Sequence, residues 1–287
     1  MNGRAIWTIT TQTFTDSIRS RWLIVFGAIF FVLATSVTLL NFAADGFDLA
    51  AVQAMCDSVC PVNFVAQYLS GFVAVVYPYI PLLTLPMGAA LIVEERELGT
   101  LQYIMSNPIS KADFLLGRML GMLFATEVVV TVGFGVATIL VFRNDLTQYP
   151  PFATATGAAF VLNGIMLFLS MIVSALTKRK TTAIGISVVI WLLFTVIGTA
   201  QTFSVYLNLR AGPWASLPPM LLNPVNTAQD WATLLLGQDI RTTGATGLII
   251  TTLFHDSTGL VLASTLIAWL IGCFAIAFLL FRHQDVI

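Results

Sequence analysis

Residues 94–121 read EERELGTLQYIMSNPISKADFLLGRMLG and separate two long apolar runs of the chain. After the charged start, Gly99-Thr100 predicts the end of one helix and the beginning of another, with Thr100 as the N-cap. Leu101, Ile104 and Met105 then recur at helical spacing. The stretch therefore predicts a short amphipathic helix held between two apolar helices.

The sequence also indicates where this short helix ends and where the next one begins. Asn107-Pro108 predicts a stop, because proline cannot continue a helix through its own nitrogen. Ser110 and Asp113 have the spacing of a capping box for the helix that follows. The alternative is a surface loop that merely joins two spans.

Outward from this connector, six runs are long and apolar enough to cross a membrane, which takes about 20 residues. The predicted spans are 22–40, 64–93, 114–142, 158–176, 182–203 and 260–281. Their continuous apolar character predicts an all-α polytopic membrane protein with a single membrane domain over residues 1–287.

Composition excludes most other classes. Of the 287 residues, 57% are hydrophobic and 9% are charged, whereas soluble domains carry about a quarter charged residues. The mean hydropathy is +0.90. With 13 Lys and Arg against 14 Asp and Glu, no basic surface for nucleic acid is expected.

Two of the spans carry unusual residues. Residues 64–93 contain Pro78, Pro81 and Pro86, which predict a kinked or broken helix. The next span carries Glu127 near its middle, where a carboxyl group is costly. Glu127 is a candidate for the transport path; alternatively it is a strut between helices, with Gln67, Asn163 or Gln201 as partner.

The distribution of basic residues predicts the orientation. If both termini are cytoplasmic, ten Lys and Arg face the cytoplasm and three face outside, as the positive-inside rule requires. The cytoplasmic set is Arg4, Arg19, Arg21, Arg96, Lys111, Arg118, Lys178, Arg179, Lys180 and Arg282, and the outer set is Arg143, Arg210 and Arg241. We therefore expect a multi-pass protein of the cell (inner) membrane.

The N-terminal stretch has the pattern of a helix lying in the lipid headgroup layer. Trp7, Phe14, Ile18 and Trp22 fall on one helical face. The alternative is a frayed tail leading into the first span. No cleavable signal peptide is evident, because this stretch is interrupted by polar residues.

Outside the membrane, two features are candidates for function. Cys56 and Cys60 lie in the loop between the first two spans and could be a disulfide, free thiols or a soft Cu(I) site, the disulfide being favoured over the metal. Residues 204–259 contain four prolines and two tryptophans, and predict one or two short helices on the outer face. These would be a gate, a docking surface for an accessory protein, or a lid packing the spans.

The connector resembles the signature of the ABC-2 type transporter permeases. Its matching residues are Glu94, Glu95, Glu97, Gly99, Thr100, Leu101, Ile104, Met105 and Pro108. The resemblance implies that the short helix is a coupling helix, which docks in a groove of a separate cytoplasmic ATPase subunit. It also implies a homodimer of permeases in the membrane lipid, moving a substrate without bond chemistry.

The chain itself has no phosphate-binding G-x-x-x-x-G-K-[ST] sequence, and no nucleophile elbow or His-Glu metal motif. No catalytic residue and no cofactor in this chain are expected; ATP and Mg would be bound by the partner ATPase.

Three shorter pieces are similar to the branch of the family that serves maturation of nitrous oxide reductase, a copper enzyme. They are residues 19–23, 178–180 and 220–227. The implied cargo is a sulfur or copper-related species for export. The alternatives are a drug, lipid or haem exporter of the same superfamily, and a membrane enzyme or channel without an ATPase.

Overall fold

The computed structural model describes residues 3–44, 64–100, 109–142, 149–199, 210, 212–242 and 245–283. Over these residues all regular structure is helical, which confirms the all-α prediction. The α-helices are α1 (Gly3–Arg19), α2 (Arg21–Ala44), α4 (Phe64–Val76), α5 (Ile80–Glu97), α7 (Lys111–Phe142), α8 (Tyr149–Leu176), α9 (Lys180–Thr199), α11 (Pro213–Leu221), α12 (Pro224–Leu235), α13 (Ala245–Phe254) and α14 (Thr258–His283). Short 3₁₀ turns η1 (Tyr77–Tyr79), η3 (Ile240–Thr242) and η4 (His255–Ser257) join some of them.

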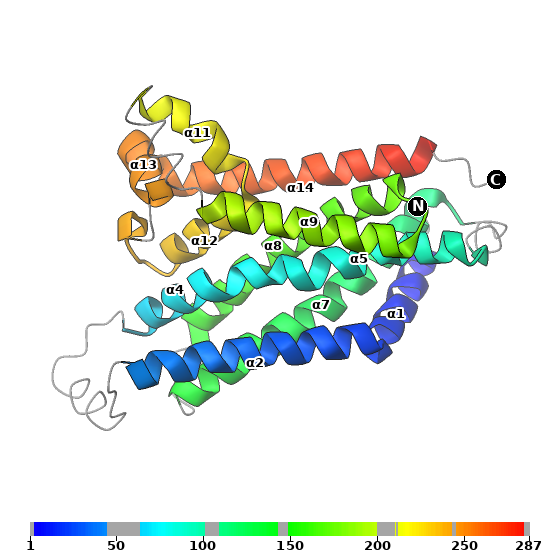
Figure 1. Ribbon diagram of the computed structural model, residues 1–287, viewed down its shortest axis with the longest axis horizontal. Coiled ribbons are helices and arrows are strands. Elements are labelled where there is room, and N and C mark those ends of the chain that lie inside the picture. The colour runs from blue at the N-terminus through cyan, green and yellow to red at the C-terminus, as the bar shows by residue number, and fades with distance from the viewer. Residues whose placement is uncertain are drawn as a thin grey trace.

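The long helices run side by side, and the short ones gather at one end (Figure 1). Helices α11, α12 and α13 lie at that end, whereas α1 and the last turns of α5 and α14 lie at the other. The two ends of the described chain are therefore on the same side of the bundle.

Four helical stretches of the described chain are long and apolar enough to cross a membrane. They are Ser70–Glu97, Lys111–Val136, Pro150–Leu176 and Thr246–Arg282. Two shorter apolar stretches, Leu23–Leu33 and Lys180–Thr195, lie within α2 and α9. The protein is thus membrane-embedded and multi-pass, and the count of six spans stays a prediction.

Two of the helices begin before the apolar runs that are predicted as spans. Helix α8 begins at Tyr149 rather than residue 158, because Pro150 and Pro151 fall in the first turn, where no backbone donor is required. Helix α7 begins at Lys111, directly after the predicted cap residue Ser110. There the Ser110 hydroxyl oxygen accepts a 3.0 Å hydrogen bond from the Asp113 amide, as the capping-box prediction requires.

The predicted break in the second apolar run is confirmed at Pro78, which lies in η1 between α4 and α5. Polar contacts from other helices stabilise the break. The Trp191 indole donates to the Pro78 carbonyl at 2.7 Å, and the Tyr77 hydroxyl donates to the Ala155 carbonyl at 2.7 Å. The Pro78 carbonyl at the kink therefore has a hydrogen-bond partner inside the protein, as irregular backbone at membrane depth requires.

The core lies around α5 and α8, whose apolar stretches are the most buried of the four. Near the kink, the Phe134 ring makes edge contacts with Phe72 and Tyr77, at centroid distances of 5.0 and 6.1 Å. In contrast, only 22% of the apolar window within Thr246–Arg282 is buried. Such a surface is suited to lipid or to another apolar chain.

Helix α1 packs along the first half of α7, and the frayed-tail alternative is wrong. Close approach depends on Gly121, since a Cβ placed there would lie 2.6 Å from the Thr10 carbonyl oxygen. The buried face of α1 consists of Thr10, Thr13 and Ser17, while Trp7 is 67% exposed. Ile18 of the predicted apolar face is also exposed, whereas Phe14 packs against the main core, and the position of α1 in the headgroup layer stays a prediction.

Candidate coupling site and buried polar cluster

The C-terminal end of α5 leads directly into the predicted coupling segment. The helix ends at Glu97, and Gly99 adopts φ +74°, a left-handed conformation that glycine adopts without strain. The Leu98 side chain is exposed, although it is apolar. Helical geometry resumes at Thr100, so the predicted break at Gly99-Thr100 is confirmed.

The four charged residues at this end of α5 are all engaged. Glu95 forms an ion pair with Arg118 of α7, and Glu94 forms one with the Lys180 ammonium of α9 at 2.7 Å. Glu97 accepts a hydrogen bond from the Lys180 backbone N–H at 3.0 Å. Arg96 donates to the Thr177 carbonyl, just beyond α8, also at 3.0 Å. These charged residues therefore connect α5 to α7, to α9 and to the residue that follows α8.

The Glu95–Arg118 ion pair lies between the two helices that flank the connector. Glu95 lies in the last turns of the helix before residues 101–108, and Arg118 lies two turns into the helix after them. Both side chains are mostly buried, at 21% and 13% exposure. The Thr100 hydroxyl also donates to the Glu95 carbonyl oxygen at 3.1 Å. The pair thus joins the two helices that flank the connector.

Sequence reasoning singled out the glutamates but not their partners. Arg118 and Lys180 were counted only as topology signals, since nothing in their spacing shows which acid each one meets. Leu101, Ile104, Met105 and Pro108 lie outside the described residues, and their role stays a prediction.

A second polar cluster lies deep in the bundle around Asn163 of α8. The Asn163 amide donates to Glu127 at 3.1 Å and to the Thr126 hydroxyl at 2.9 Å. The Thr84 hydroxyl of α5 donates to the Asn163 side-chain oxygen at 2.6 Å. Asn163 is fully buried, and it joins α5, α7 and α8.

This cluster bears on the two interpretations of Glu127. Of its three predicted partners, Asn163 is in contact; the Gln67 side chain and Gln201 lie outside what the structure describes. The second carboxyl oxygen of Glu127 is buried and has no hydrogen-bond partner among the described residues. The contact with Asn163 agrees with the interpretation of Glu127 as a strut between helices. The carboxyl oxygen without a partner is compatible with a role in the transport path.

The short helices at the opposite end are attached to the spans by side-chain hydrogen bonds. The Asn223 side chain caps α12 by accepting from Val225 N at 3.0 Å and donates to the Phe194 carbonyl of α9 at 2.8 Å. The Trp269 indole of α14 donates to the Leu221 carbonyl at 3.0 Å. These hydrogen bonds hold the short helices against the bundle, as expected of a lid.

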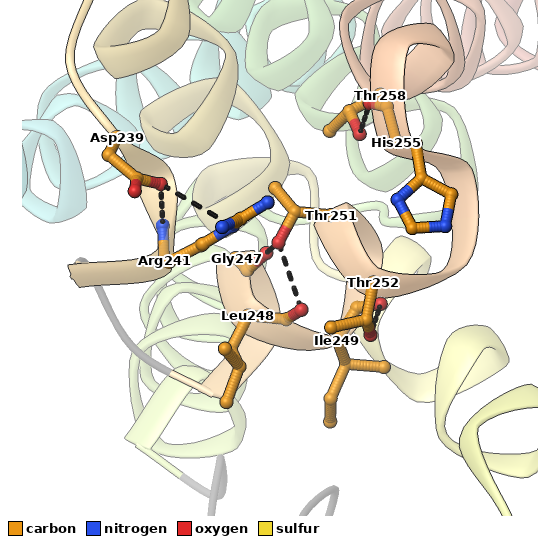
Figure 2. Close-up of polar contacts among 9 residues, drawn as sticks. All are labelled: Asp239, Arg241, Gly247, Leu248, Ile249, Thr251, Thr252, His255 and Thr258. Carbon is orange, nitrogen blue, oxygen red and sulfur yellow. Dashed lines mark hydrogen bonds and ion pairs between the residues drawn. The ribbon is translucent and has the colours of Figure 1, made fainter.

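Polar side chains of α13 and its neighbours mainly support local structure (Figure 2). The Thr251, Thr252 and Thr258 hydroxyls donate to backbone carbonyls three or four residues earlier. Arg241 lies beside Asp239, with Nε 3.9 Å from the carboxyl oxygen. Within the described residues, this end shows no assembled chemical site.

The cysteine predictions are mostly outside the described part of the chain. Cys56 and Cys60 both fall there, so the choice between disulfide, thiols and metal is untested. Cys273 is a free, buried thiol of α14, as a packing residue would be. No group of three metal-ligating side chains occurs among the described residues.

Comparisons with known proteins give a consistent result. The family model described as "ABC-2 family transporter protein" matches residues 7–286. The chain is similar to the "Probable ABC transporter permease protein NosY" of Pseudomonas aeruginosa, with 25% identity covering 98% of this chain and 99% of that protein. It is also 25% identical to the protein of the same description from Stutzerimonas stutzeri, over 77% of this chain and 78% of that protein.

Proposed function

This chain belongs to the ABC-2 family of ABC transporter permeases, and we propose that it drives export through a coupling helix formed by residues 101–108. In this proposal each copy has six spans and cytoplasmic termini, and two copies form a homodimer. A separate ATPase subunit binds ATP and Mg, and docks against the coupling helix. Such a family ordinarily supplies the membrane component, and the partner subunit hydrolyses ATP.

The observation that carries the proposal is the set of contacts at the end of α5. Glu94, Glu95, Arg96 and Glu97 connect this end to three other helices. A force applied to the adjacent connector would therefore reach α5, α7, α8 and α9 together. Closure of an ATPase pair could then rock the spans as bodies between inward- and outward-open states.

The test is reconstitution with a candidate ABC ATPase subunit from the same organism. We expect the two proteins to co-purify from detergent, and ATP hydrolysis to require both of them. Hydrolysis and substrate uptake into inverted vesicles should depend on Mg. Absence of any stable complex with a cytoplasmic ATPase would argue against the proposal, and a membrane enzyme or channel would then regain support.

For the cargo, we propose a sulfur or copper-related species used to mature a copper enzyme outside the membrane. The support is the similarity to two proteins named NosY, together with the resemblance in residues 19–23, 178–180 and 220–227. An accessory protein would then receive the cargo at the outer face. Deleting the gene should leave nitrous oxide reductase with an incomplete copper centre; normal copper loading would favour a drug, lipid or haem exporter.

A further inference from the structure

We propose that a cavity at the charged end of the bundle binds a primary ammonium group carried on an apolar body. The cavity has a volume of about 350 Å³ and lies between α1, the start of α2, α5, α7 and α9. This volume lies within the range of small-molecule sites, which is about 300–1,000 Å³. The site lies beside the coupling contacts but is not formed by them alone.

One part of the cavity wall is apolar. Phe26 of α2, Pro86, Met87 and Leu91 of α5, and Ile184 of α9 line it. The sequence pattern predicts that α1 lies in the headgroup layer, which would place this wall where acyl chains meet headgroups. An amphiphile could therefore enter from the membrane and keep its apolar body against these residues.

The polar part of the wall has an excess of negative charge. Asp16, Glu94 and Glu95 line the cavity, and Arg118 and Lys180 are its cations. Each cation is already paired, Arg118 with Glu95 and Lys180 with Glu94. Asp16 is in electrostatic range of Arg118 but has no direct ion pair within the described chain. Arg19 and Arg21 flank the site without lining it. A bound cation would balance Asp16, whereas an anion would have to displace a carboxylate.

A second observation points to a hydrogen-bond donor in the ligand. Thr13 lines the cavity and is 1% exposed, yet its hydroxyl oxygen has no hydrogen-bond partner among the described residues. Its neighbours behave differently: Thr10 and Thr15 donate to the carbonyls of Ile6 and Thr11, both at 2.8 Å. A buried hydroxyl without a partner is costly. A primary ammonium could donate to Thr13 and pair with Asp16 at once.

The test uses dansylcadaverine, a primary ammonium on an apolar fluorophore, with the purified permease in dodecyl maltoside. We expect saturable binding to the wild type, and no comparable binding of the uncharged N-acetyl derivative. Asp16→Asn should weaken binding about fivefold, the upper range for a partly exposed ion pair. Thr13→Val should weaken it about threefold. Asp256→Asn changes an exposed aspartate at the opposite end, so its affinity should match the wild type.

Competition then identifies the source of the ammonium. Displacement by phosphatidylethanolamine but not by phosphatidylglycerol indicates a lipid headgroup, and no displacement by either indicates a soluble amphiphilic amine. Equal affinity of the wild type, Asp16→Asn and Thr13→Val proteins, or equal binding of the acetylated dye, would overturn the proposal. Because the ATPase is absent from this assay, its result is independent of the coupling mechanism.

Discussion

The Glu95–Arg118 ion pair should stabilise the fold measurably, although most ion pairs near a protein surface do not. Both side chains are more than three-quarters buried, so removing one partner leaves a poorly hydrated charge. Asp16 and Glu94 are also in electrostatic range of Arg118. Replacing Arg118 therefore removes a cation that is close to three carboxylates, those of Asp16, Glu94 and Glu95. Arg118→Gln should therefore lower the free energy of unfolding by about 1–3 kcal/mol.

A double-mutant cycle isolates the pair itself. We expect Glu95→Gln and Arg118→Gln to show a coupling energy of about 1–2 kcal/mol, between the values for exposed and fully buried pairs. The matched control is Asp239→Asn with Arg241→Gln, a pair that is 3.9 Å apart and more than half exposed. Its coupling energy should be below about 0.5 kcal/mol.

The cycle is measured by chemical denaturation in detergent, with tryptophan fluorescence as the signal. The same variants, reconstituted with the ATPase, should hydrolyse ATP with less transport per ATP. A coupling energy no larger than that of the control pair, together with unchanged transport per ATP, would refute the argument that this pair joins the helices flanking the connector.

Three further predictions concern other parts of the molecule. Glu127→Gln should fold normally because it can still accept from Asn163, whereas Glu127→Leu should cost about 1–3 kcal/mol in unfolding experiments; equal stability of the two would contradict the strut. Gly121→Ala should cost about 1–3 kcal/mol by forcing α1 from α7, while Gly185→Ala, which has open space around it, should be neutral or stabilising. After reduction, an impermeant thiol reagent should label Cys56 and Cys60 in intact cells, and labelling only after permeabilisation would reverse the proposed orientation.

Local signals in the sequence predicted much of the fold. The break at Pro78, the cap at Ser110 and the turn at Gly99 each depend on the local chemistry of one residue, and the structure has all three. Helix α8 begins at Tyr149, before the predicted span, because Pro150 and Pro151 are tolerated in its first turn.

The candidate site was less predictable, because its contacts join residues far apart in the chain. Glu127 has one of three proposed partners, Asn163, 36 residues away, and sequence periodicity could not choose among them. The cavity beside Asp16 was not foreseen at all. It depends on α1 packing on α7 through Thr13 and Gly121, and nothing in the polar face of α1 distinguishes a packed surface from a hydrated one.

The most direct test of ATP-driven coupling replaces the apolar face of residues 101–108. Leu101→Asp combined with Ile104→Asp would place charges in an apolar contact at a cost of several kcal/mol. We expect the variant permease to insert and elute normally, but without its ATPase and without transport. The control is Thr252→Asp with Ser257→Asp, two exposed sites at the opposite end, which should retain both. Normal ATPase retention and normal transport in the Leu101 and Ile104 variant would falsify the coupling-helix assignment.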